Sequence, residues 1–137
     1  MMEGVFEIEM MVRDYECDMQ GIVNNAVYQN YLEHGRHEFL HSVGLDFEQL
    51  CKEGIDAVVT RIEMDYKLPL KSRDVFAVRL GMRKQGRLRF VFDQAIVRKA
   101  DGKTVLEAQV TGVLTRNGRP IAPDLFDEVF RAQGWTP

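Results

Sequence analysis

Residues 24–43, NNAVYQNYLEHGRHEFLHSV, contain the longest helical pattern in the chain. At about 100° per residue, one face collects the small and apolar residues: Tyr28, Tyr31, Leu32, Gly35, Phe39 and Val43. The side-chain oxygen of Asn24 or Asn25 can accept a hydrogen bond from a free first-turn N–H, and Gly44 suits a helix end. We therefore expect a helix over about residues 24–43 that buries one face.

The segments on either side of this helix show the period of two that is typical of strands. Residues 5–12 alternate loosely. After Gly54, every second residue from Val58 to Leu70 is expected on a buried face, with charged residues opposite: Val58, Thr60, Ile62, Met64, Tyr66, Leu68 and Leu70. Pro69 indicates a strand end or an edge.

Three more strands are expected, at about residues 74–84, 87–100 and 103–116. Short turns at Gln85-Gly86 and Asp101-Gly102 join them, and RNGRP at residues 116–120 forms another turn. Short helices are expected at residues 47–52 and 124–133.

The element order is therefore one strand, one long helix and four strands in a meander, which predicts an α+β fold. Because short turns join the later strands, we expect them to be antiparallel neighbours. The helix must bury its apolar face against this five-stranded antiparallel sheet. With 137 residues and no linker or repeat, the chain is expected to form one domain over residues 1–137.

Composition argues against some partners and locations. The 18 basic and 21 acidic side chains give a formal net charge of −3, which does not favour nucleic-acid binding. No apolar segment approaches the roughly 18 residues that span a bilayer, and the acidic N-terminal residues do not resemble a signal peptide. Cys17 and Cys51 form neither a CxxC pair nor a disulfide framework. We therefore expect a cytoplasmic protein without a membrane span.

Asp18 is the first candidate for chemistry, since it lies in a loop between the first strand and the helix, closed by Gly21. A carboxylate can attack a carbonyl or activate water. The helix start beside it offers free N–H groups and the positive end of the helix dipole, which can stabilise an oxyanion. This arrangement suits acyl transfer. The alternative is structural: Asp18 forms an Asx-turn and the asparagines only cap the helix.

Two other groups could carry chemistry. Cys17 would need a base to form a nucleophilic thiolate, and all three histidines lie far along the predicted helix. We therefore interpret Cys17 as a small, partly buried structural residue. His34, Glu38 and His41 have a spacing that could ligate a metal, but they lie away from the apolar face. We interpret them as a solvated polar face and expect no metal. Basic residues near two strand ends form either a solvated rim or a site for phosphates: Lys67, Lys71, Arg73, Arg83, Lys84, Arg87 and Arg89.

The stretch RDYECDMQGIVNNAVYQNYLEHGRHEFL, residues 13–40, resembles the N-terminal signature of hotdog-fold thioesterases of the 4-hydroxybenzoyl-CoA and short-chain acyl-CoA type. The matching elements are Arg13, Asp18, Gly21-Ile22-Val23, Tyr28, Tyr31 and Glu33-His34-Gly35-Arg36. YKLPLKSRD at residues 66–74 is similar to the exit of the family's second strand. The resemblance covers most of the chain and implies a sheet wrapped around the helix.

The resemblance also implies roles for particular residues. Asp18 would be the catalytic carboxylate, as nucleophile or as general base, and the backbone N–H of Asn25 would polarise the thioester carbonyl. Substrate contacts would come from the loop and helix start, from the acyl pocket and from the basic rim: Gly21, Val23, Asn24, Tyr28, Tyr31, Val59, Lys71, Arg73 and Arg89. The family pairs as homodimers with active sites at the interface, often as dimers of dimers. No cofactor is implied.

Two departures bear on the substrate. Many relatives carry Tyr-His or Phe-Tyr where this chain has Asn24-Asn25, and the run from Val23 to Tyr28 instead resembles acyl-carrier-protein thioesterases. Those enzymes have a histidine where Ile22 stands. With no histidine in the loop or the first helical turn, a dehydratase of this fold is disfavoured. We expect an acyl-CoA thioesterase. The alternatives are a thioesterase for acyl carrier protein in fatty acid synthesis and a non-catalytic acyl-CoA-binding protein.

Overall fold

The computed structural model describes residues 6–133. Its strands are β1 (Phe6–Met11), β2 (Ile55–Tyr66), β3 (Val75–Gln85), β4 (Arg89–Arg98), β5 (Thr104–Arg116) and β6 (Arg119–Ile121). Its helices are α1 (Val27–Ser42), α2 (Phe47–Lys52) and α3 (Asp127–Ala132), with single 3₁₀ turns at Asp14–Glu16 and Asp124–Phe126. The expected α+β class is confirmed. Val5, expected to begin the first strand, lies outside the described residues.

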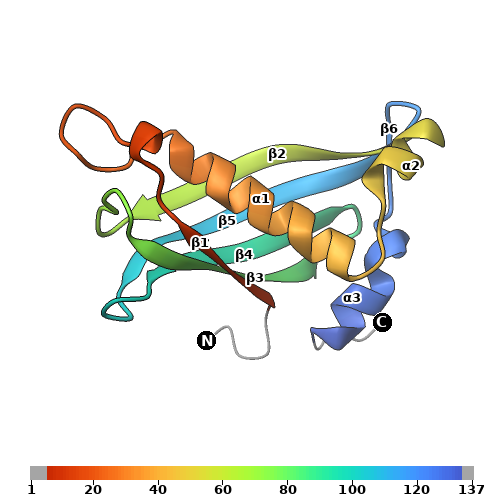
Figure 1. Ribbon diagram of the computed structural model, residues 1–137. Coiled ribbons are helices and arrows are strands. Elements are labelled where there is room, and N and C mark those ends of the chain that lie inside the picture. The colour runs from red at the N-terminus through yellow and green to blue at the C-terminus, as the bar shows by residue number, and fades with distance from the viewer. Residues whose placement is uncertain (1–5, 134–137) are drawn as a thin grey trace.

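The strands form one antiparallel sheet in the order β1-β3-β4-β5-β2, with the short β6 paired to β5. The sheet curves around α1, which lies along its concave side (Figure 1). The expected meander is confirmed for β3, β4 and β5, but β2 was predicted beside β3 and in fact pairs with β5. The reason is the connection at residues 67–74, where Lys67 and Leu68 donate to the Val105 carbonyl and carry the chain across the sheet end. β6 was expected only as part of a turn.

The prediction of one buried face on β2 is wrong for the single chain. Only Ile55 of this strand is buried, whereas Val58, Val59 and Ile62 are 44%, 46% and 39% exposed. β2 is an edge strand, and α1 packs over β3 and β1 instead. A β-bulge between Val59 and Arg61 also shifts the alternation.

The apolar face predicted for the long helix is buried as expected, apart from its last residue. Tyr28, Tyr31, Leu32, Gly35 and Phe39 are buried, and Val43 is exposed because it follows the end of α1. Gly35 allows the close approach of helix and sheet, since a Cβ there would lie 2.7 Å from Val78 Cγ1. The core therefore lies between α1 and the concave face of the sheet.

The long helix begins three residues later than predicted. The Asn24 side chain accepts from the Ala26 N–H at 3.0 Å, and the Asn24 carbonyl accepts from the Val27 N–H at 2.9 Å. These bonds form a turn before the helix, and Ala26 takes the cap position without a side-chain bond. Gly44, at φ +84°, follows the helix end as predicted.

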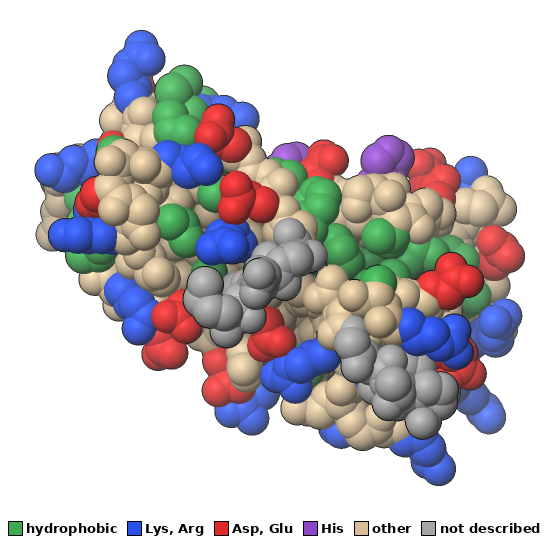
Figure 2. All heavy atoms as spheres, turned by 90° about the horizontal axis from the view of Figure 1, so that it is seen from below, with side chains coloured by type: hydrophobic (Ala, Val, Ile, Leu, Met, Phe, Trp, Pro, Cys, Tyr) green, Lys and Arg blue, Asp and Glu red, His purple; other side chains and the backbone are tan. Residues whose placement is uncertain are grey.

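Residues on and beside the strands that point away from the core form several ion pairs. Arg79 lies 3.2 Å from Glu7, Arg83 lies 2.8 Å from Asp93, and Lys67 lies 3.8 Å from Glu107. Figure 2 shows basic and acidic side chains interspersed over the face it presents. Such mixed charge gives no single-sign field that would attract a polyanion. No helix within residues 6–133 has the length and apolar character needed to cross a membrane.

Candidate active site

Asp18 lies at the tip of a small hairpin between β1 and α1. Its N–H donates to the Ile22 carbonyl at 2.9 Å, and its carbonyl accepts from the Gly21 N–H at 3.0 Å. Gly21 has a φ of +79°, a left-handed conformation that glycine adopts without steric cost. Isolated bridges join Cys17 to Val23 and Ile22 to Lys71. The hairpin is therefore tied to the segment that follows β2.

The Asp18 carboxylate forms the Asx-turn that the sequence allowed, and it is exposed as well. Its Oδ1 accepts from the Gln20 N–H at 2.8 Å. Its Oδ2 accepts no hydrogen bond from any described residue. The turn fixes the direction of the carboxyl group, and the second oxygen remains available to water or to a carbonyl carbon. The structural role and the chemical one are therefore compatible.

The peptide groups around Asn25 are held on both sides. The preceding carbonyl, of Asn24, is bonded to Val27. The Asn25 carbonyl accepts from the Tyr66 hydroxyl at 3.2 Å. The Asn25 N–H itself donates to no acceptor within residues 6–133. It is therefore an oriented donor at a helix start, the property that stabilisation of an oxyanion needs.

Glu16 joins the Asp18 hairpin to the long helix. Its carboxylate accepts from the Tyr31 hydroxyl and from the Arg13 N–H, each at 2.8 Å, and its side chain is 10% exposed. Its carbonyl accepts from the Asn24 N–H at 3.0 Å. Burial, and then the bond to Glu16, raises the pKa of Tyr31, so this hydroxyl remains a donor at any working pH. One acidic residue thus fixes both the hairpin and the helix start.

Tyr28 holds the segment after β2. Its hydroxyl accepts from the Leu70 N–H at 3.1 Å, and its ring packs edge-on against Tyr66, with centroids 5.7 Å apart. Burial raises the pKa of Tyr28. Both Tyr28 and Tyr31 are core residues, at 4% and 1% exposed, and their hydroxyls are bonded within the protein. Their contact with an acyl chain remains a prediction.

The basic residues expected around the substrate divide between two ends of the sheet. Lys71 and Arg73 are exposed beside the Asp18 hairpin, and neither forms an ion pair with a described residue. Arg89 begins β4 and pairs with Gln85, at the end of the sheet away from this hairpin. A single chain therefore ties Lys71 to the Asp18 hairpin and keeps Arg73 two residues away from it in sequence, whereas Arg89 lies at the other end of the sheet.

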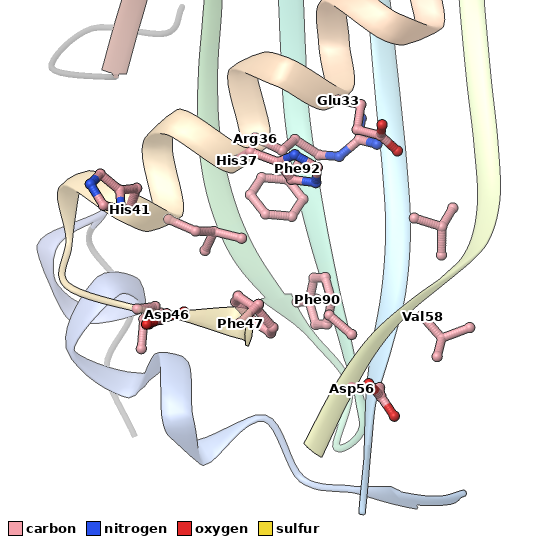
Figure 3. A pocket seen from close by; sticks show the side chains of 14 residues that line it. Glu33, Arg36, His37, His41, Asp46, Phe47, Asp56, Val58, Phe90 and Phe92 are labelled. Atoms are coloured by element: carbon pink, nitrogen blue, oxygen red, sulfur yellow. The ribbon is translucent and has the colours of Figure 1, made fainter. Parts of the chain in front are cut away.

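A cavity of about 450 Å³ lies between the second half of α1, the start of α2, β2 and β4 (Figure 3). The side chains that shape it include Arg36, Leu40, Phe47, Val58, Phe90 and Phe92. Val59, expected at the acyl pocket, lines this cavity, whereas Asp18 and Asn25 do not. Phe90 and Phe92 were not predicted at this cavity, because a buried aromatic on a strand gives no local sign that it faces a cavity.

Cys17 lies in the Asp18 hairpin, and the three histidines lie on α1. Cys17 is half-buried against the core, and its N–H donates to the Asp14 carbonyl. His34, His37 and His41 are exposed on α1. Within the described part of the chain no cluster of histidine, cysteine or acidic side chains has the arrangement of a metal site. The structure thus brings no histidine to Cys17 as a base.

Comparison with known proteins identifies the family. The family model described as the thioesterase-like superfamily matches residues 12–134. The chain belongs to this superfamily. The chloroplastic acyl-acyl carrier protein thioesterase ATL3 of Arabidopsis thaliana is 38% identical over 121 residues, which cover 88% of this chain and 64% of that protein. The chain thus spans somewhat less than two thirds of this plant relative.

Two bacterial proteins extend the comparison. The long-chain acyl-CoA thioesterase FadM of Escherichia coli is 26% identical over 107 residues, 78% of this chain and 80% of that protein. The crystal structure of a hypothetical protein from Aquifex aeolicus superposes with a TM-score of 0.83 at 31% identity, and covers 91% of this chain and 98% of that one. The curved antiparallel sheet with its helix is the hotdog fold, as the sequence resemblance implied.

Proposed function

We propose that this protein hydrolyses acyl thioesters, with the Asp18 carboxylate as the reactive group and the Asn25 N–H as the oxyanion donor. The observation that carries the proposal is the Asn25 N–H. Hydrogen bonds to the Asn24 and Asn25 carbonyls fix the peptide groups on either side of it. The N–H itself has no partner in the described chain and lies at a helix start. Asp18 belongs to the hairpin that leads into the same turn. Membership of the thioesterase-like superfamily supports this chemistry.

In this mechanism the thioester carbonyl oxygen accepts a hydrogen bond from the Asn25 N–H. Asp18 then either attacks the carbonyl carbon or removes a proton from an attacking water. The first route forms a mixed anhydride and expels the thiolate, which takes up a proton, and water then hydrolyses the anhydride. The second route gives the acid and the thiol through one tetrahedral intermediate. Neither route requires a cofactor.

The substrate that we propose is an acyl-CoA, and the alternative is an acyl carrier protein thioester. Both have a phosphorylated pantetheine arm, and the exposed Lys71 and Arg73 beside the hairpin can pair with phosphate. FadM supports the first assignment and the Arabidopsis relative supports the second. An assay of matched acyl-CoA and acyl-carrier thioesters decides between them.

We further propose a cytoplasmic homodimer that forms along β2, itself able to pair into a dimer of dimers. β2 is an edge strand whose exposed apolar residues include Val58, Val59 and Ile62. An antiparallel two-fold contact between two β2 strands places the start of one beside the end of the other. Arg89 of one copy would then lie nearer the Asp18 hairpin of its partner than that of its own chain. Light scattering of the purified protein tests this assembly.

Asp18→Asn tests the proposed chemistry. We expect a folded protein whose kcat for every hydrolysed thioester falls by at least about 100-fold, the scale of an acid–base contribution. Cys17→Ser is the matched control from the neighbouring position and should retain most of the activity. Near-normal turnover by Asp18→Asn would refute the role of this carboxylate. Saturable acyl-CoA binding without hydrolysis by the wild type would instead indicate a binding protein.

A further inference from the structure

Two cavities join along the long helix to form one groove. The cavity of about 450 Å³ and a smaller one of about 190 Å³ share Glu33, Arg36 and Val59 as lining residues. The smaller cavity begins at Gln29 and Asn30, about one helical turn after the Asn25 N–H. We call the two cavities together the α1–β2 groove. It runs from the first turn of α1 toward Leu40 and Phe47.

The ring of Phe90 stands at the far end of this groove. In Figure 3 its side chain rises from β4 between Phe47 and Val58. Phe90 is 4% exposed and packs edge-on against Phe92 and Phe126, with centroids 5.8 Å and 5.1 Å away. Because aromatic neighbours hold the ring on two sides, it cannot move aside at low cost.

Gly112 on β5 leaves room for the Phe90 ring on a third side. A Cβ at this position would lie 2.7 Å from Phe90 Cζ and 2.9 Å from the Val58 carbonyl oxygen. The ring of Phe90 therefore occupies space that any larger residue at position 112 would fill. The Phe90 ring at the end of the groove is thus closely packed and has little room to move.

The polar groups of the groove do not favour an anionic ligand. Arg36 is 8% exposed, and its guanidinium already donates to Gln94 Oε1 at 3.0 Å. Glu33, Asp46 and Asp56 also line the larger cavity, so an anionic end group would meet three carboxylates there. The apolar residues of its lining include Leu40, Phe47, Val58, Phe90 and Phe92. A neutral, apolar chain is the ligand that this lining suits.

We propose that the α1–β2 groove holds an unbranched aliphatic acyl chain and that Phe90 sets the longest chain accepted. This inference rests on the proposed thioesterase function, since it places the thioester at the Asn25 N–H. From Gln29 to Leu40 the helix advances about 16 Å, a length that an extended chain of roughly twelve carbons covers. A compact aromatic acyl group would fill only the first part and would not reach Phe90.

The test compares the wild type with Phe90→Leu and Phe90→Ala over the even-numbered saturated acyl-CoA series from hexanoyl to octadecanoyl. We expect the chain length of highest kcat/KM to increase by about two carbons in Phe90→Leu and by more in Phe90→Ala. Phe6→Leu is the matched control, because Phe6 packs on Phe39 and does not line the groove. Its profile should keep the wild-type maximum.

Binding of non-hydrolysable S-alkyl-CoA thioethers separates this inference from the proposed function. Each methylene that gains buried contact contributes about fourfold in affinity, so Phe90→Leu should bind the analogue two carbons beyond the wild-type limit roughly 15-fold more tightly. This result would support the groove even if no thioester were hydrolysed. An unchanged chain-length dependence in folded Phe90 variants would overturn it, as would an equal loss for all chains. Asp18→Asn should lose turnover and keep the wild-type binding profile.

Discussion

Tyr66→Phe tests whether the oxyanion donor is positioned by a side chain from β2. The Tyr66 hydroxyl donates to the Asn25 carbonyl at 3.2 Å, and the residue is 50% exposed. A neutral hydrogen bond of this length in a partly solvated place contributes about 1 kcal/mol. If that energy orients the Asn25 N–H in the transition state, its loss lowers kcat about fivefold. KM should change by less than about twofold, because the substrate contacts remain.

Steady-state kinetics on the best thioester substrate gives both constants. Tyr15→Phe is the matched control, because Tyr15 is 80% exposed and its hydroxyl forms no hydrogen bond with a described residue. Tyr15→Phe should keep the wild-type Tm, and Tyr66→Phe should lower it by no more than about 4 °C, the shift that a loss of about 1 kcal/mol gives in a chain of this size. An unchanged kcat in Tyr66→Phe would show that Asn25 is oriented without this hydroxyl. A rise in KM alone would instead assign Tyr66 to substrate binding.

Three further changes test the packing and the charges. Gly35→Ala places a Cβ 2.7 Å from Val78 Cγ1, and overpacking of about 1–3 kcal/mol should exceed the helix gain of about 1 kcal/mol; urea denaturation measures the net loss. Tyr31→Phe leaves a nearly buried carboxylate without its donor from the helix, so the free energy of unfolding should fall by about 1.5–3 kcal/mol in the same assay. Arg98 lowers the pKa of Asp101 from 3.8 to about 2, so the stability that this pair contributes is present above pH 3.8 and lost as pH falls through about 2. An NMR titration should give that midpoint for Asp101, and an Arg98→Gln variant should return it toward 3.8.

Local patterns predicted most of the secondary structure. α2 begins and ends where expected, because Asp46 caps it by accepting from the Gln49 N–H at 3.2 Å. β3, β4 and β5 begin and end within two residues of their predicted ranges, and the predicted short turns join them. The pairing of β2 with β5 could not be predicted in this way, since it depends on contacts between residues far apart in sequence. For the same reason the exposure of β2 was missed.

The candidate site was predicted only in part. The residues alone allowed Asp18 to be a turn residue or a reactive carboxylate, and the family resemblance favoured the second. The structure shows the turn and, beside it, the partnerless Asn25 N–H. No sequence pattern indicated that Tyr28, Tyr31 and Tyr66 would each hold a different segment of the site. Such bonds join residues 15 to 42 positions apart, where local periodicity carries no information.

The place of β2 in the sheet also has a consequence during synthesis. Tyr66 pairs with Leu106 and Ile55 with Arg116, so β2 is translated well before the strand that it joins. At about 5–20 residues per second, a ribosome needs several seconds to complete β5 after β2. During that time a strand that carries Val58, Val59 and Ile62 has no native strand to pair with. Until β5 is complete, the backbone N–H and C=O groups of β2 are open to pairing with another chain.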